Sequence, residues 1–321
     1  MANEIQPQHC GDGHLADVNA LPLPSLFSAL SATGLVRRLL ELARDEDLGE
    51  AGDVTSLVAI APTQQGRAQL VARSGGIISG LAVIPELISV FAPDVAWHPA
   101  HDDGVEGDSR CVLGTLTGPL RQILALERTM LNLVARLSGI ATLTAQYVRA
   151  LPGGTRAGIY DTRKTTPGNR VLEKYAVRCG GGRCHRLGLH DAMLIKDNHI
   201  AGVTPSKLAA FVQDAATRAR AMRALYFVEV EVDTLDQFEA LLTLPPGLID
   251  IVLLDNMSPD LLREAARRRE HAQPRLELEA SGGVTLGTLP LIASTGVDRI
   301  SVGALTHHAV SRDVALDVVS E

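Results

Sequence analysis

The sequence predicts an α/β protein with two parts, a small α+β domain and a larger domain built on a parallel β-sheet. Three observations predict this arrangement. Short β-type runs separated by Gly, Pro and Asp clusters occupy residues 66–120, one long helical pattern covers 121–150, and strand-like and helix-like segments alternate after residue 154. The alternation is compatible with an open sheet and with a barrel.

The composition excludes several classes of protein. With 46% hydrophobic and 21% charged residues, the chain of 321 residues is typical of a folded protein rather than a disordered one. No apolar run reaches the roughly 18 residues that span a membrane. A net charge of -7 with only 3% aromatic residues argues against a nucleic-acid binder. Four cysteines without a C-x-x-C pair, and an N-terminus without a basic and apolar leader, predict a cytoplasmic protein.

The elements of the first part follow in chain order. Residues 1–34 show no sustained periodicity, so we expect an extension that is mobile at least in part, with a short helix over 21–30. The first clear helix begins at Leu35 and ends at Gly49. Runs of β type at 68–72, 76–79 and 111–117 precede the long helix.

The second part contains six expected strands, at 157–160, 192–196, 225–232, 249–254, 276–280 and 299–302, with helical patterns such as 205–223 and 259–270 between them. The strong polar clusters follow the carboxyl ends of these strands, where α/β barrels and open α/β sheets place their sites. Neither G-x-G-x-x-G nor G-x-x-x-x-G-K-[ST] is present, so dinucleotide-binding and P-loop folds lose their main support.

One segment of this acidic protein is strongly basic. Residues 163–186 hold Arg163, Lys164, Arg170, Lys174, Arg178, Arg183, His185 and Arg186. Arg163, Lys164 and Arg186 stand beside Gly-rich loops, where backbone N–H groups and Arg side chains can hold an anion. The spacing of 170, 174 and 178 instead favours a solvated helix face. We expect a small, highly anionic substrate.

Alternating carboxylates mark two strands. Glu229 and Glu231 share one face of the strand at 228–232, and Leu276-Glu277-Leu278-Glu279 repeats the pattern. Inward carboxylates need partners, and Lys196 is the obvious one. We interpret the deeper Glu229 and Glu277 as members of an ion-pair network. We expect Glu231, Glu279 and Asp255 at the mouth, where they could bind sugar hydroxyls or Mg²⁺.

Two late glycine turns, 281–283 and 303–304, follow the last strands and are typical of a phosphate cradle. A zinc site is disfavoured, because Cys179, Cys184, His185 and His190 match no standard ligand spacing. His307 and His308 are interpreted as structural or peripheral.

The motifs taken together resemble the quinolinate phosphoribosyltransferase family, whose enzymes are also called decarboxylating nicotinate-nucleotide pyrophosphorylases. The D-T-R-K-T-T-P-G run at 161–168 carries the strongest likeness. It continues through residues 174–178, 185–189, 194–199, 229–232, 254–256, 281–283 and 302–307, with earlier matches at 46–55, 127–132 and 137–142. The likeness runs from about residue 35 to the end of the chain.

The resemblance implies a fold and an activity. After an extension at 1–34, residues 35–131 would form an α/β sandwich domain, with 306–321 as a candidate addition to it, and 132–305 an incomplete α/β barrel. The enzyme would join quinolinate to phosphoribosyl pyrophosphate with loss of carbon dioxide in NAD biosynthesis, would require Mg²⁺, and would be a homodimer or a higher homo-oligomer.

The resemblance also implies residue roles. Arg128 from the neighbouring subunit, with Arg163, His185, Arg186 and Lys196, would hold the two carboxylates, and Lys164 and Thr165 would line the donor side. Glu231 and Asp255 would hold ribose hydroxyls and Mg²⁺. The phosphate cradle would consist of Ser281, Gly282, Gly283, Val302, Gly303 and Ala304. Lys164, Lys196, Glu231 and Asp255 would be catalytic.

Four departures from the family pattern stand out. Cys184 replaces a common Asn, His308 replaces a small residue, residues 243–247 are an apparent insertion, and 1–34 have no role in the pattern. The alternatives are a related phosphoribosyltransferase, using nicotinate or serving a pathway such as molybdenum transport, and a non-catalytic binding protein on the same scaffold. The complete set of cations argues against the first, and Glu231 and Asp255 argue against the second.

Overall fold

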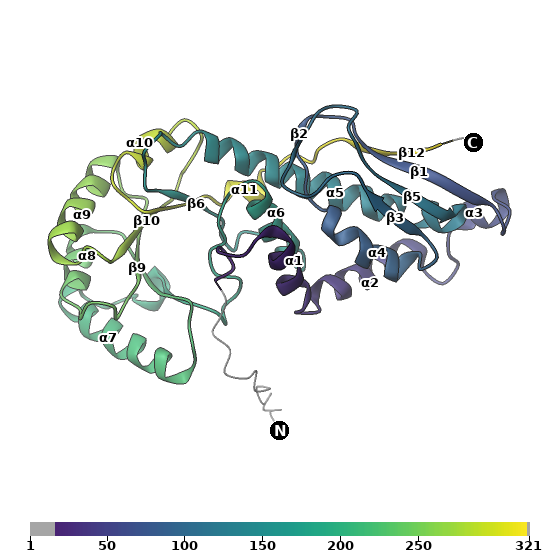
Figure 1. The fold of residues 1–321 in the computed structure, drawn as a ribbon. Coiled ribbons are helices and arrows are strands. Elements are labelled where there is room, and N and C mark those ends of the chain that lie inside the picture. The colour runs from purple at the N-terminus through teal and green to yellow at the C-terminus, as the bar shows by residue number, and fades with distance from the viewer. Residues whose placement is uncertain (1–16, 320–321) are drawn as a thin grey trace, which may run out of the picture.

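The structure, a computed structural model, describes residues 17–319. Figure 1 shows an elongated molecule with an antiparallel sheet at one end and a strand–helix domain at the other; the long helix α5 (Leu120–Arg149) contacts both. The short helix predicted over 21–30 is α1 (Leu23–Ser31), and the part of the predicted extension up to residue 16 lies outside the described residues. None of the helices within 17–319 is long and apolar enough to cross a membrane.

The first domain is built on a four-stranded antiparallel sheet in the order β12–β1–β5–β3. Its strands are β1 (Gln65–Ala72), β3 (Ala96–Pro99), β5 (Val112–Pro119) and β12 (Val314–Val318). Ala68 and Leu70 alternate along β1 and are fully buried, because alternate side chains point to the same face of a strand. β12 pairs with β1 through Leu316 and Leu70, so the end of the chain returns to this domain.

Helices and short elements complete the first domain. The helix predicted from Leu35 is α2 (Leu35–Leu48), which ends at Gly49 as expected. The other elements are α3 (Val54–Ala59), η1 (Leu81–Val83), α4 (Ile84–Phe91) and the small pair β2 (Gly76–Ile77) and β4 (Glu106–Gly107). Helices α2, α4 and α5 contact one another, and α5 also contacts β1 and β5. The predicted small α+β domain is therefore confirmed.

The second domain has six parallel strands in the order β6–β11–β10–β9–β8–β7, and all six predicted strands are confirmed. They are β6 (Gly158–Tyr160), β7 (Met193–Ile195), β8 (Val228–Val232), β9 (Ile251–Asp255), β10 (Glu277–Ser281) and β11 (Arg299–Ser301). Strands β6 and β7 stand at the two edges and do not pair with each other, so the barrel is incomplete.

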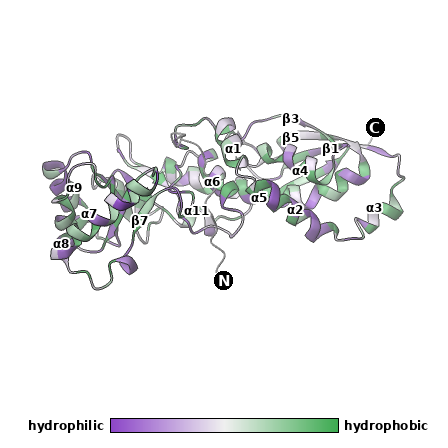
Figure 2. Cartoon of the chain, turned by 90° about the horizontal axis from the view of Figure 1, so that it is seen from below, coloured by the Kyte–Doolittle hydropathy of each residue, from purple (hydrophilic) through white to green (hydrophobic). Residues whose placement is uncertain are grey.

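Helices cover the outer side of this sheet, as Figure 1 shows for α7, α8 and α9. The helices of this domain are α6 (Arg170–Cys179), α7 (Pro205–Met222), α8 (Leu235–Leu242), α9 (Pro259–Ala272), α10 (Leu289–Ala293) and α11 (Ala304–His307), with the 3₁₀ helix η2 at Asp197–His199. Helices α6 and α11 contact α5. In Figure 2 helices α7 to α9 carry both hydrophilic and hydrophobic stretches, as expected of helices that bury only one face. Val228 and Val230 are fully buried in β8, which leaves the inner face to the two glutamates.

Candidate active site

A cavity of about 800 Å³ opens at the carboxyl ends of the barrel strands. It brings together most of the predicted site residues: Arg163, Lys164, His185, Arg186, Lys196, Glu231, Asp255, Ser281, Gly282, Gly283, Val302, Gly303 and Ala304. A larger cavity, about 1080 Å³, lies at the opposite, amino ends of the strands. There Asp250 is already paired with Arg220 at 2.6 Å. We place the active site at the smaller cavity, where the concentrated cations and the glycine loops meet.

Two predicted site residues do not line this cavity. Thr165 is half-buried, and its hydroxyl oxygen accepts a hydrogen bond from Arg170 Nε at 3.0 Å. Arg128 is exposed on α5 and makes no hydrogen bond or ion pair within residues 17–319. The predicted contributions of these two residues to substrate binding stay predictions.

The ends of adjacent strands place two carboxylates and a lysine together. Lys196 Nζ lies 2.6 Å from Glu231 Oε2, which confirms the predicted pairing of Lys196 with an inward glutamate. Asp255 ends the next strand, and its Oδ2 accepts a hydrogen bond from Asn256 Nδ2 at 2.7 Å. Mg²⁺ is usually bound by one or two carboxylates together with substrate phosphates. Two carboxylates beside an open cavity fit that ion.

The two glycine loops offer backbone donors. The N–H groups of Gly282, Gly283 and Gly303 have no hydrogen-bond partner among the residues that the structure describes. Gly282 has φ +93°, and a Cβ there would collide with the Asn256 side chain. A Cβ at Gly303 would lie 2.8 Å from Lys164 Cδ. Glycine is therefore required at 282 by backbone conformation and contact, and these donors remain available to an anion.

Basic side chains are crowded at two places in the cavity. Burial, followed by the neighbouring charge of Arg163, lowers the pKa of Arg186. Burial, followed by His308 and Lys164, lowers the pKa of His307. Both imidazoles line the cavity, which the sequence pattern did not indicate. Because like charges repel one another unless an anion lies between them, Arg163 and Arg186 mark one place that favours an anion, and beside His307 the positive charge is that of Lys164.

The segment 184–188 crosses the gap between the two barrel edges and presents Arg186. Its start pairs with β6, since Arg183 N donates to Ile159 O at 2.8 Å and Asp161 N donates to Arg183 O at 3.0 Å. Five consecutive backbone N–H groups then donate to side chains at 2.7 to 2.9 Å: Cys184 to Asn19, His185 to Asp161, Arg186 to His185, and Leu187 and Gly188 to Asp191. Two side chains from distant parts of the chain, Asn19 and Asp161, and two nearby ones, His185 and Asp191, therefore fix this irregular backbone.

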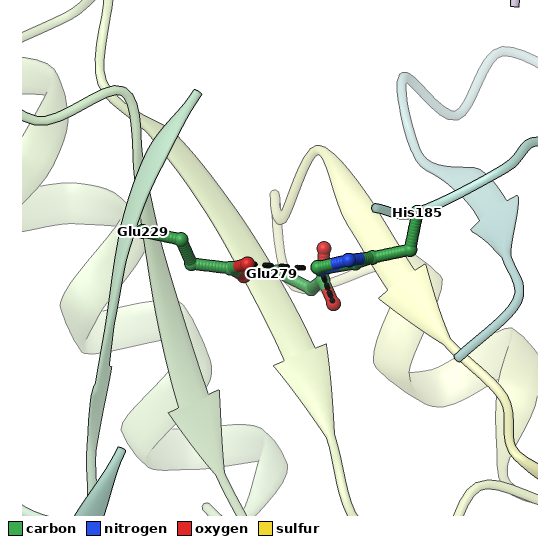
Figure 3. A group of neighbouring side chains, drawn as sticks. All are labelled: His185, Glu229 and Glu279. Carbon is green, nitrogen blue, oxygen red and sulfur yellow. Dashed lines mark ion pairs between the residues drawn. The ribbon is translucent and has the colours of Figure 1, made fainter. Parts of the chain in front are cut away.

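A buried ionic cluster lies beneath this segment. His185 Nε2 lies 2.9 Å from Glu229 and 3.5 Å from Glu279, and Figure 3 shows the three side chains pointing toward one another. Arg299 Nε donates to Glu279 at 2.7 Å, so a cation already neutralises that carboxylate. Although the three residues could hold a metal by geometry, Arg299 makes the cluster a structural ion-pair network. The network predicted for Glu229 is confirmed.

The protonation of this cluster follows from its contacts. Burial, followed by the charge of Glu279, raises the pKa of Glu229. Burial alone would lower the pKa of His185, but Glu279 and Glu229 outweigh it and raise that pKa. His185 Nδ1 accepts the Arg186 N–H at 2.7 Å and so carries no proton. The two raised pKa values mean that the pair of His185 and Glu229 keeps a proton at a pH where a free Glu and a free His have released theirs.

Three predictions are wrong in detail. Lys174 is not on a solvated helix face: it is fully buried and lies 2.5 Å from Asp161. Glu279 was expected at the mouth; it does line the cavity, but it is fully buried and paired with Arg299 and His185. Glu277, expected at depth, is half-exposed and 3.4 Å from Arg299. Helical and strand spacing give the face on which a residue lies but not what covers that face.

The comparisons with known proteins agree with the geometry. The family model described as "Quinolinate phosphoribosyl transferase, C-terminal domain" matches residues 140–317, and the model for the N-terminal domain of the same family matches 53–138. The chain belongs to the quinolinate phosphoribosyltransferase family.

Curated relatives and solved structures of this family are similar over most of the chain. A probable nicotinate-nucleotide pyrophosphorylase (carboxylating) of Bacillus subtilis is 41% identical over 88% of this chain and 93% of its own. The Mycobacterium leprae nicotinate-nucleotide pyrophosphorylase is 42% identical over 90% of this chain and 97% of its own. The structure of the Francisella tularensis nicotinate-nucleotide pyrophosphorylase has a TM-score of 0.78 at 34% identity, covering 95% of this chain and all of that one. The predicted fold class and family are confirmed.

Within the family pattern, the departures occupy definite places. Cys184 is buried, its Sγ lies 3.7 Å from the Lys174 carbonyl oxygen, and burial raises the pKa of the thiol to about 12. His308 lines the cavity beside His307, with ring centroids 4.2 Å apart. Residues 243–247 connect α8 to β9, outside the cavity at the carboxyl ends.

Sequence reasoning missed several contributors to the site. Asn19 and Asp191 hold the 184–188 backbone, and His307 and His308 line the cavity. The quoted family motifs include Asn256, but the pattern alone does not indicate its positive φ of 52°. A carboxylate shortly after a Gly-containing loop, such as Asp191, is a local signal that could have indicated a backbone acceptor.

Proposed function

We propose that the protein joins quinolinate to phosphoribosyl pyrophosphate in this cavity, giving nicotinate mononucleotide, pyrophosphate and carbon dioxide. This is the reaction of the family to which the chain belongs, and it makes the protein a pentosyltransferase of NAD biosynthesis. One observation carries the residue assignment: a single cavity combines four cationic side chains with the carboxylates of Glu231 and Asp255. The four are Arg163, Lys164, Arg186 and Lys196.

The acceptor side consists of Arg163, Arg186 and Lys196. Quinolinate carries two adjacent carboxylates, and the planar Arg side chains suit them because each can donate two parallel hydrogen bonds. The crowding of Arg163 and Arg186 supports this role, since a dianion relieves their repulsion. A direct contact of His185 with quinolinate stays a prediction, because both of its ring nitrogens already contact protein groups.

The donor side consists of the glycine loops and the group around Lys164. The unpaired N–H groups of Gly282, Gly283 and Gly303 support a phosphate cradle that includes Ser281, Val302 and Ala304. Lys164 supplies positive charge for the diphosphate, and this charge contributes to the lowered pKa of the neighbouring His307. Glu231 and Asp255 would hold the ribose hydroxyls and Mg²⁺, which when bound neutralises part of the diphosphate charge.

The chemistry follows from these positions. As the bond from C1 of ribose to pyrophosphate breaks, positive charge develops on the sugar, and the carboxylates of Glu231 and Asp255 stabilise it. The ring nitrogen of quinolinate forms the new bond and becomes cationic. When carbon dioxide leaves C2, this cationic ring stabilises the electron pair that remains, and C2 then takes up a proton. Lys196 contacts the quinolinate and is paired with Glu231, which holds the ribose, so the pair orients the ring nitrogen toward C1 of the ribose.

The assembly and location are also proposals. The exposed and unpaired Arg128 supports a homodimer in which this side chain completes the neighbour's acceptor side. Four cysteines without a C-x-x-C pair support a cytoplasmic location.

The test is the formation of carbon dioxide and nicotinate mononucleotide by the purified protein with both substrates. We expect quinolinate to be used and nicotinate to be used at least about a hundredfold less well, because loss of one carboxylate leaves a buried cation unpaired at a cost of about 3–5 kcal/mol. Comparable turnover of the two acids would favour the alternative of a related phosphoribosyltransferase. Binding of both substrates without any turnover would favour the non-catalytic alternative.

A further inference from the structure

Residues 17–31 precede both family domains, which begin at residue 53, yet they contact the acceptor side of the active site. The Asn19 side-chain amide makes two hydrogen bonds to the backbone of one residue of the barrel domain, Cys184. Cys184 N donates to Asn19 Oδ1 at 2.7 Å, and Asn19 Nδ2 donates to Cys184 O at 2.9 Å. No other residue within 17–319 bonds to either of these backbone groups of Cys184.

The segment that carries Asn19 is itself anchored. The Leu21 carbonyl oxygen accepts a hydrogen bond from Arg178 Nη2 at 3.0 Å. In α1, Leu26 is fully buried, and the Phe27 ring packs edge-on against Tyr175 of α6 at a centroid distance of 5.2 Å. Asn19 therefore connects the packed helix α1 to the loop that follows α6. Because its own segment is held in place, Asn19 can restrain the Cys184 backbone.

We infer that Asn19 is a positioning residue for Arg186 in the transferase reaction. Cys184 lies two residues before Arg186, at the start of the segment whose N–H groups all donate to side chains. Without the Asn19 amide, the N–H and the C=O of Cys184 lose the partners that they have among residues 17–319, and the two adjoining peptide units keep only their bonds to Asp161. The segment then samples more conformations, and the Arg186 side chain loses part of its alignment with the acceptor carboxylates.

The inference predicts a specific pattern in the two substrates. Asn19 acts on the acceptor side, whereas the glycine loops of the donor side follow β10 and β11, and within residues 17–319 no hydrogen bond joins them to Asn19. Removal of the amide should therefore weaken quinolinate binding and leave use of phosphoribosyl pyrophosphate nearly unchanged. A general loss of protein stability would instead weaken the binding of both substrates to a similar extent.

The experiment uses Asn19→Ala in the full-length chain, with Ser28→Ala as the matched control. Ser28 is on the same segment, but its hydroxyl group donates only to Pro24 O within α1. We expect the quinolinate Kd of Asn19→Ala, measured by calorimetry, to rise about tenfold, with the KM for phosphoribosyl pyrophosphate changed less than twofold. Ser28→Ala should match the wild type.

Hydrogen exchange and a second variant keep the test decisive. Exchange of the 184–188 amides should be faster in Asn19→Ala and unchanged in Ser28→Ala. Asn19→Asp keeps the acceptor for Cys184 N–H and loses the donor, so it should weaken quinolinate binding by a smaller factor. An unchanged Kd, or equal losses for both substrates, would overturn the inference. A wild-type chain that forms no nicotinate mononucleotide would overturn the proposed function, on which this inference rests, and is recognised before any variant is compared.

Discussion

The two anion-binding sides of the cavity use their backbone in opposite ways. In the 184–188 segment all five N–H groups donate to side chains of the protein, so the Arg186 side chain is left as the ligand group. In the loops at 282–283 and 303 the N–H groups have no partner among the described residues, so the backbone itself is available. A planar carboxylate suits the first arrangement, and a phosphate suits the second.

The largest effect should come from the side chain that the acceptor segment presents. We expect Arg186→Ala to lower the affinity for quinolinate about a hundredfold or more, because truncation leaves a desolvated carboxylate without its charged partner. The affinity for phosphoribosyl pyrophosphate should change little. Calorimetry with each substrate alone is the measurement, with Arg218→Ala on the exposed surface of α7 as the control. An equal loss of affinity for both substrates would show that the acceptor side and the donor side do not bind independently.

The donor side should be sensitive to the backbone instead. Gly282→Ala introduces a Cβ at φ +93° that meets the Asn256 side chain, so the loop must move and its N–H groups lose their arrangement. We expect the KM for phosphoribosyl pyrophosphate to rise by about tenfold or more while quinolinate binding is retained. Gly287→Ala is the matched control, because its φ is not positive and its nearest contact would be Thr285 at 3.8 Å. A normal KM in Gly282→Ala would exclude the loop from the phosphate site.

The difference between the two sides also explains what the sequence could predict. The glycine turns and the strand-end carboxylates are local features, since each follows a strand that its own residues specify. The fixation of the acceptor segment is only partly local, because two of its five bonds go to Asn19 and Asp161. Asn19 and Cys184 are 165 residues apart, and nothing in either neighbourhood indicates the pairing. The spacing of Lys174 predicted a helix correctly, but the burial of that lysine depends on Asp161 in another element.

The last and smallest effect concerns the proton beneath the acceptor segment. The pKa values of Glu229 and His185 are both raised, so the folded pair keeps a proton at a pH where an unfolded Glu and His, with pKa values of about 4.3 and 6.5, have released theirs. Because the folded state then binds more protons than the unfolded state, the stabilisation is complete only below about pH 4.3 for Glu229 and below about pH 6.5 for His185, and each part is lost as the pH rises through the raised pKa of that group. The wild-type free energy of unfolding should therefore fall over that window by up to about 1.4 kcal/mol per pH unit.

Glu229→Gln keeps an oxygen beside Nε2 of His185 and has no proton to lose, so the slope of its free energy of unfolding against pH should be shallower. The measurement is urea unfolding from pH 6 to pH 9 without Mg²⁺. Glu264→Gln is the control, because Arg267 and Arg268 lower the pKa of exposed Glu264 to about 2, far below the window. If all three proteins lose stability in parallel, the pair does not carry the proton, and the acceptor segment is held by neutral hydrogen bonds alone.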